Sequence, residues 1–150
     1  MNNSYTSKNI EDTIVLAQNL ESEKFPNMVI CLNGELGSGK TVFVKGFASA
    51  MGIQENITSP TFNIIKEYLN GELPLNHMDA YRFEDEDESL GLRDYFNNGG
   101  VTIIEWPENV AEFLPKERLD IEIKIIDENK RIFKLTPHGE RYEEIINFII

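Results

Sequence analysis

The chain has 150 residues, with 26 acidic and 14 basic side chains and a net charge of −12. This length fits one domain over residues 1–150 and disfavours a large AAA+ or helicase-type motor, while the negative charge opposes direct binding to a nucleic-acid backbone. No apolar run has membrane-spanning length and the polar start lacks a signal-peptide pattern, so we expect a cytoplasmic protein without a membrane partner.

Hydrophobic periodicity and turn residues predict helices that alternate with strands. In chain order the predicted elements are a helix from residue 10 to about 25, a strand at 28–32, a helix at 42–51, strands at 62–69 and 73–81, a helix at 89–96, strands at 101–104, 119–125 and 131–136, and a helix at 140–149. The first helix is expected to bury Ile10, Ile14 and Ala17, which follow helical spacing, with Leu16 and Leu20 widening this apolar stripe. Cys31 lies in an apolar run and is expected to be a small buried hydrophobic residue.

Residues 62–81 predict an antiparallel hairpin, which a purely parallel sheet would not contain. Asn70 and Gly71 are a strong signal for its turn, and Pro74, near the start of the returning strand, suggests an edge position. The acidic run at residues 84–88 is interpreted as a solvated loop ahead of the next helix, with a metal site as the alternative.

The stretch Gly34–Thr41 matches the pattern G-x-x-x-x-G-K-[ST] at every fixed position and lies between a predicted strand and a predicted helix. Its glycines allow backbone N–H groups to approach phosphate oxygens, and the positive end of the helix strengthens this field. Lys40 is expected to contact the β- and γ-phosphates, and Thr41 to ligate the Mg²⁺ that bridges them. The alternative is a glycine-rich turn with a solvated lysine. The candidate nucleotide-binding residues of the loop are Gly37, Ser38, Gly39, Lys40, Thr41 and Val42.

Hydrolysis also requires a carboxylate that organises the metal. The apolar strand at 101–104 is followed by Glu105, whose long side chain suits contact with Mg²⁺ through a coordinated water; the alternative is an exposed glutamate at a strand end. Asp79 is a second candidate, because it alternates with His77 and Tyr81 along one strand face and a strand end near the loop would aim its carboxylate at the γ-phosphate or its metal. His77 itself is interpreted as a structural histidine rather than a general base.

A Ser-Pro-Thr turn that contains Thr61 lies between the P-loop helix and the hairpin, where a nucleotide-sensing switch would sit; a rigid turn is the alternative. Several motifs of the chain are informative in combination. They are residues 34–41, Ser59-Pro60-Thr61-Phe62 with Glu67-Tyr68, His77 to Arg82, Leu92 to Phe96, and Ile104-Glu105-Trp106. In combination they resemble the bacterial TsaE (YjeE) family, small P-loop ATPases of tRNA threonylcarbamoyladenosine biosynthesis, over nearly the whole chain.

This resemblance implies a P-loop NTPase-like three-layer α/β fold whose central mixed sheet has parallel and antiparallel strands. It implies ATP and Mg²⁺ as the cofactors, with Thr41 and Glu105 as the residues that organise the metal. It further implies that Asp79 assists hydrolysis, that residues 59–62 act as switch I, and that Trp106 lies beside the nucleotide. The residues that contact the adenine base are not assigned by the resemblance, and residues 7–13 and Arg141 are the candidates.

The same resemblance implies TsaB and TsaD as partners, which transfer the threonylcarbamoyl group to adenosine 37 of tRNAs that read ANN codons. ATP hydrolysis would then reset or license their complex between turnovers. The excess of acidic side chains agrees with contact to tRNA only through these partners.

A P-loop protein can also be a small-metabolite kinase, a GTPase or a nucleotide-gated interaction module. A small-metabolite kinase would need cationic clamps on the transferred phosphate, and the five arginines of the chain form no evident lid cluster. A GTPase is disfavoured because no N-K-x-D motif is present. A nucleotide-gated interaction module with negligible hydrolysis alone stays open, since no arginine finger is evident and slow intrinsic turnover is expected.

Overall fold

The computed structural model of the chain describes residues 3–58, 65–81 and 89–150, and this described part contains a seven-stranded sheet. The strands are β1 (Ser4–Ser7), β2 (Val29–Gly34), β3 (Ile65–Tyr68), β4 (Leu75–Asp79), β5 (Val101–Glu105), β6 (Arg118–Ile125) and β7 (Arg131–His138). The helices are α1 (Ile10–Ser22), α2 (Lys40–Ala50), α3 (Ser89–Phe96), the 3₁₀ segment η1 (Pro107–Phe113) and α4 (Glu140–Ile149). None of these described helices is long and apolar enough to cross a membrane.

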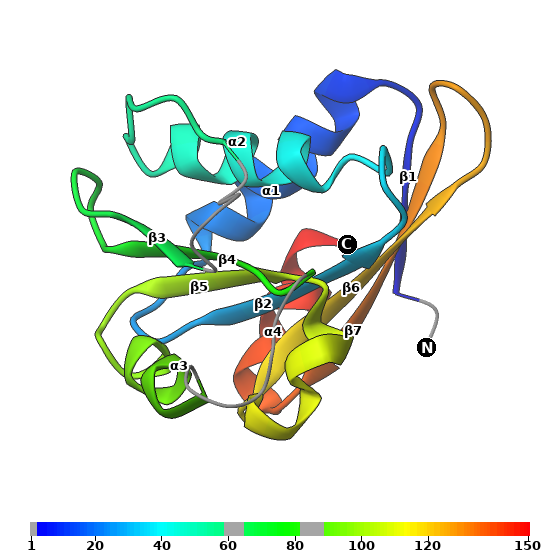
Figure 1. The fold of residues 1–150 in the computed structure, drawn as a ribbon. Helices are drawn as coiled ribbons and strands as arrows, with labels where there is room; N and C mark the ends of the chain where they lie inside the picture. Colours follow the sequence, from blue (N-terminus) through cyan, green and yellow to red (C-terminus); the bar gives the residue numbers. More distant parts are fainter. Residues whose placement is uncertain (1–2, 59–64, 82–88) are drawn as a thin grey trace.

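Strand β2 lies in the middle of the sheet, whose order is β1-β7-β6-β2-β5-β4-β3 (Figure 1). It runs parallel to both of its neighbours, β5 and β6, and β4 runs parallel to β5. The pairs β3–β4, β6–β7 and β1–β7 are antiparallel. The prediction of a mixed sheet is therefore confirmed, and the carboxyl ends of β2, β5 and β4 meet at one edge.

Two apolar cores cover the two faces of the sheet. Side chains alternate along β2, so Ile30 and Leu32 join the core formed with α1, α2 and α4, whereas Val29 and Cys31 join the core formed with α3 and η1. Figure 1 shows α1 and α2 on the opposite side of the sheet from α3 and η1. The predicted three-layer arrangement is confirmed. Cys31 is buried as predicted, and burial raises the pKa of its thiol.

Helix α1 packs closely against α2 at a glycine. A Cβ at Gly46 would lie 3.3 Å from both the Cβ of Ala17 and the Cα of Ile14, so a larger residue would force the two helices apart. The predicted apolar stripe is confirmed at Leu16, Ala17 and Leu20, which are buried, and wrong at Ile10, which is 60% exposed at the first position of α1.

The hairpin of β3 and β4 is confirmed as antiparallel, but its connection and its place in the sheet differ from the prediction. Tyr68 pairs with Leu75, so residues 69–74 connect the strands, a longer connection than residues 70–72, which the predicted strands left between them. Strand β4 lies between β3 and β5, and the edge position predicted from Pro74 is therefore wrong. Pro74 precedes β4, and its carbonyl accepts a hydrogen bond from the Val101 N–H at 2.8 Å. Its missing N–H therefore costs the β4 ladder nothing.

Two elements were not predicted from the sequence. Strand β1 is short and polar, and pairs with the edge of β7. Segment η1 follows β5 directly and begins with proline at its first position. The start of the strand predicted at 62–69 and the acidic run at 84–88 lie outside the described residues.

Gly100, just before β5, lies against the backbone of Pro74, and a Cβ there would sit 2.4 Å from the Pro74 carbonyl oxygen. Gly100→Ala is expected to lower the free energy of unfolding by about 2 kcal/mol, because the chain before β4 must shift to relieve the overlap. Gly91→Ala in α3 is the matched control, since its Cβ would meet no described atom within 4 Å and alanine favours the helix. Urea unfolding curves measure both variants. Equal midpoints for Gly100→Ala and the unchanged chain would contradict this crowding.

Candidate functional site

The loop between β2 and α2 turns at two glycines. The backbone φ is +79° at Gly37 and +108° at Gly39, in the left-handed region that favours glycine. Helix α2 begins at Lys40, directly after Gly39, so the unpaired N–H groups of its first turn border the loop. The strand, loop and helix thus have the arrangement that phosphate binding requires, at the carboxyl edge of the parallel strands.

The interior of the loop is tight and contains an unsatisfied hydroxyl. The Ser38 Oγ is buried and has no hydrogen-bond partner among the described residues. A Cβ at Gly34 would lie 2.6 Å from this oxygen and 3.2 Å from the Ile123 carbonyl oxygen, so a larger residue would crowd the loop. A buried hydroxyl without a partner is costly, and a phosphate oxygen would provide the acceptor it lacks. The geometry of the loop therefore fits a bound phosphate group.

The side chain of Lys40 lies between the loop backbone and an aromatic ring. Its ammonium donates a hydrogen bond to the Gly34 carbonyl at 2.7 Å and lies 3.7 Å from the centre of the Trp106 ring. Burial lowers the pKa of Lys40, and the carboxylates of Glu105 and Asp79 oppose this shift. Trp106 has a φ of +58°, an uncommon value for a residue other than glycine, at the turn from β5 into η1. The structure therefore brings Lys40, Glu105 and Trp106 into one site.

Glu105 and Asp79 end the neighbouring strands β5 and β4 and pair in register. Glu105 is only 3% exposed, and its carboxylate accepts a hydrogen bond of 2.6 Å from the Nε2 of buried His77. The alternative of an exposed glutamate is therefore wrong, and the structural interpretation of His77 agrees with this contact. Asp79 accepts a hydrogen bond from the Tyr81 N–H at 3.1 Å. Burial raises the pKa of Asp79, while this hydrogen bond acts in the opposite direction.

Arg131, at the start of β7, contacts the loop and was missed by the sequence analysis. Its Nε donates to the Ser38 carbonyl at 3.2 Å and its Nη2 to the Gly37 carbonyl at 3.3 Å. Its Nη1 donates to the Asp127 carbonyl at 2.6 Å, so one guanidinium ties the β6–β7 turn to the loop. Its partners are backbone carbonyls, two of them over ninety positions away, and no sequence motif marks such contacts.

Of the remaining predicted nucleotide contacts, Thr41 and Val42 lie in the described part of the chain and Thr61 does not. Thr41 and Val42 are half-buried in the first turn of α2, directly after Lys40. Thr61, and with it the proposed switch at residues 59–62, lies outside the described residues.

The two candidate segments for the base lie at different ends of the sheet. Residues 7–13 begin at the P-loop end, because Ser7 pairs with Arg131. Arg141 instead borders a pocket together with Val29, the first residue of β2, and so lies at the end opposite the P-loop. Arg141 is therefore not part of this site.

A glycine loop that joins a central parallel strand to a helix, with Lys40 at the first helical position, defines a P-loop nucleotide-binding protein of the α/β class. The family model described as "Threonylcarbamoyl adenosine biosynthesis protein TsaE" matches residues 7–133. The chain therefore belongs to the TsaE family, and membership of this family implies nucleotide binding.

Relatives and a solved structure agree with this assignment. The tRNA threonylcarbamoyladenosine biosynthesis protein TsaE of Bacillus subtilis (strain 168) is 49% identical over 135 residues, which cover 90% of this chain and 85% of the relative. The protein of the same name from Treponema pallidum (strain Nichols) is 42% identical over 105 residues, which cover 69% of this chain and 77% of the relative. The crystal structure of Bacillus subtilis YdiB superposes with a TM-score of 0.83 and 41% identity, over 97% of this chain and 91% of that chain.

Arg131→Lys is expected to weaken binding of an adenine nucleotide about tenfold, because a single ammonium cannot reproduce the forked contacts that hold the loop carbonyls. Titration with a fluorescent ATP analogue measures the dissociation constant, and urea unfolding confirms that the variant is folded. Lys130→Met is the matched control, since it changes the neighbouring basic residue and leaves the guanidinium contacts in place. Unchanged affinity in folded Arg131→Lys would show that the loop does not need these contacts.

Proposed function

We propose that this chain is the ATP-binding and ATP-hydrolysing subunit required for threonylcarbamoylation of adenosine 37 in tRNAs that read ANN codons. The family description and the names of the B. subtilis and T. pallidum relatives support the pathway. The observation that best supports ATP binding and hydrolysis is the P-loop at the carboxyl edge of the sheet. Lys40 lies at the start of α2, and Glu105 lies at the end of the strand adjacent to β2. A cytoplasmic location is proposed because the pathway in the family description modifies tRNA.

In this proposal the loop binds the triphosphate of ATP as the substrate. The backbone N–H groups of residues 37–41 and the hydroxyl of Ser38 donate to phosphate oxygens. The ammonium of Lys40 exchanges its contacts with the Gly34 carbonyl and the Trp106 ring for the β- and γ-phosphates. This exchange leaves Trp106 at the edge of the nucleotide.

The residues at this edge fit a Mg²⁺ ion that arrives with ATP. In the described part of the chain, no three His, Cys, Asp or Glu side chains group into a preformed metal site. The hydroxyl of Thr41 and the carboxylate of Glu105 are the proposed protein contacts. His77 contacts one carboxylate oxygen of Glu105, so the other oxygen would be the one to help hold the ion through a water. When bound, the ion stabilises charge on the phosphate oxygens.

Asp79 is proposed to assist hydrolysis, either as a base toward the attacking water or in the shell around the metal. Burial raises its pKa, which makes its carboxylate a better proton acceptor than that of a surface aspartate. The arginine that contacts the loop in the described residues, Arg131, donates to carbonyl groups rather than toward the phosphate side. We therefore propose slow turnover by the chain alone.

TsaB and TsaD are the proposed partners, and tRNA is reached only through their complex. The family description supports a shared pathway. The net charge of −12 supports the indirect contact, because an acidic protein is repelled by the phosphate backbone.

A nucleotide-gated interaction module is the second candidate function. It is favoured by the contacts of Lys40 with Gly34 and Trp106, which nucleotide binding would release.

Two variants separate binding from hydrolysis. Lys40→Ala is expected to weaken ATP binding by about tenfold or more, because the loop loses its only ammonium. Glu105→Gln keeps an acceptor for His77 and is expected to bind ATP within about threefold of the unchanged chain, while phosphate release falls about a hundredfold. Nucleotide titration and a phosphate-release assay give the two quantities. Normal turnover by Glu105→Gln would remove Glu105 from the proposed metal shell.

Phosphate release measured with and without TsaB and TsaD separates the two candidate functions. An ATPase of this pathway is expected to turn over faster with the partners than alone, and Lys40→Ala is expected to abolish the stimulation. Size-exclusion chromatography of the three proteins with and without ATP shows whether the complex depends on the nucleotide. ATP-dependent co-elution without turnover under any condition would favour the interaction module over the ATPase.

A further inference from the structure

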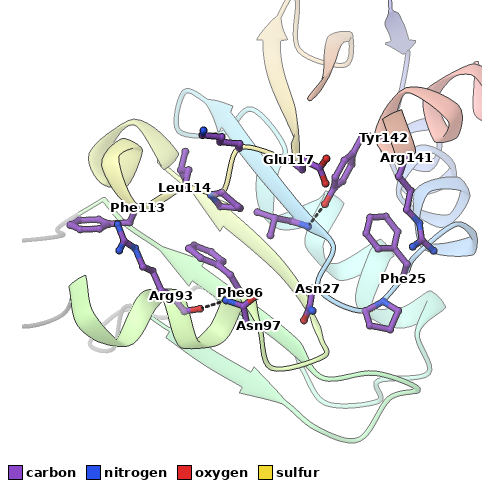
Figure 2. A pocket seen from close by; sticks show the side chains of 14 residues that line it. Phe25, Asn27, Arg93, Phe96, Asn97, Phe113, Leu114, Glu117, Arg141 and Tyr142 are labelled. Atoms are coloured by element: carbon purple, nitrogen blue, oxygen red, sulfur yellow. Dashed lines mark hydrogen bonds between the residues drawn. The ribbon is translucent and has the colours of Figure 1, made fainter. Parts of the chain in front are cut away.

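The pocket that Arg141 borders lies at the amino end of β2, where the proposed function places no residue. It has a volume of about 610 Å³ and opens between the segment before β2, the end of α3, the end of η1 and the start of α4 (Figure 2). Val29 lines it, whereas the P-loop follows Gly34 at the other end of the same strand, roughly 17 Å away at 3.3 Å per residue. The size falls in the range of ligand-binding pockets.

The charge of this pocket is opposite to that of the whole chain. Arg93 of α3, Lys116 ahead of β6 and Arg141 of α4 line it, against a single acidic side chain, Glu117. The chain as a whole has 26 acidic and 14 basic residues. None of the three basic side chains forms an ion pair with another described residue. Arg141 also lies in the first turn of α4, where the helix dipole adds positive potential and Glu140 and Glu143 add negative charge.

Both arginines lie over aromatic rings. The guanidinium carbon of Arg141 lies 3.9 Å from the centre of the Phe25 ring, and that of Arg93 lies 5.9 Å from the centre of the Phe113 ring. Figure 2 shows these two pairs on opposite sides of the pocket, with Phe96 between them in the view. A guanidinium that stacks on a ring keeps its N–H edge available for a planar anion.

The wall beside Arg141 is fixed by further contacts. The hydroxyl of Tyr142 accepts a hydrogen bond from the Val29 N–H at 2.9 Å, and its ring packs edge-on against Phe25 with centroids 5.3 Å apart. Tyr142 is buried, so the base of α4 is held on the start of β2. This wall of the pocket is thus formed by the fold itself, while the three basic side chains are exposed at its rim.

We propose that this pocket binds an acidic peptide segment of a partner protein. Carboxylates of the peptide pair with Arg93 and Arg141, which suit planar bidentate anions, and a large apolar side chain enters among the aromatic rings. A nucleic acid is disfavoured because the net charge of −12 repels an extended phosphate backbone and the pocket offers only three cations. The proposal does not rest on nucleotide binding at the P-loop.

The test uses the full chain and a fluorescein-labelled peptide Asp-Glu-Phe-Leu-Asp-Glu, with Asn-Gln-Phe-Leu-Asn-Gln as the uncharged counterpart. Fluorescence anisotropy is expected to show about tenfold or tighter binding of the acidic peptide. The double variant Arg93→Gln with Arg141→Gln is expected to weaken that binding about tenfold or more. Lys134→Gln removes an exposed basic side chain outside the pocket and is expected to leave binding unchanged.

Four results would overturn the proposal: no measurable binding of either peptide, equal binding of both, insensitivity to the double variant, or tighter binding of a labelled oligothymidylate of equal charge. Arg93→Lys with Arg141→Lys keeps the charges and loses the planar forks, so an intermediate affinity is expected should the glutamine pair unfold the chain. Lys40→Ala is expected to bind the acidic peptide as the unchanged chain does. Measurements on this variant therefore test peptide binding at the pocket separately from nucleotide binding at the P-loop.

Discussion

The parallel register of β2, β5 and β4 is the constraint on which the candidate site depends. Leu32 of β2 pairs with Glu105, and Glu105 pairs with Asp79, so both carboxylates stand at the edge where the P-loop begins. A slip of one residue would turn each of these side chains to the opposite face of the sheet. Alternate residues of β2 are buried in different cores, and this double burial resists the slip. The geometry of the site is therefore set by apolar packing rather than by contacts between the polar residues themselves.

That packing also creates an electrostatic problem, which the site solves with neighbouring groups. Glu105 is almost fully buried, and a buried carboxylate is unstable without a donor. His77, on the adjacent strand, supplies that donor and fixes the direction of the carboxylate. Lys40 is also removed from water, and its ammonium is held by the Gly34 carbonyl and the face of Trp106. His77 thus acts through Glu105 as a positioning residue, and Trp106 shields the lysine.

The parts of the site that could be predicted from the sequence are those set by local patterns. The P-loop follows from spacing within eight residues and from the periodicity of its flanks, and Glu105 from a strand that ends in an acid. Arg131 could not be found this way, because its contacts with the loop exist only once β7 has joined β6 and β6 has joined β2. The edge position predicted from Pro74 was wrong for a related reason. Its cost depends on whether its missing N–H falls inside a ladder, and the register places it just outside.

The two ends of β2 have opposite electrostatic surroundings, and this separation bears on how the protein would act in a complex. At the carboxyl end, Lys40 is surrounded by carboxylates, which suits a substrate that brings its own cation. At the amino end, Arg93, Lys116 and Arg141 line the pocket with one acid, Glu117, which suits a ligand that brings only negative charge. Between them β2 is covered on both faces and paired on both sides, so it offers no hinge through which one end would move the other. Because β2 is paired on both sides, we expect a partner at the amino end to leave the P-loop open, so that the chain would hold a partner and a nucleotide at the same time.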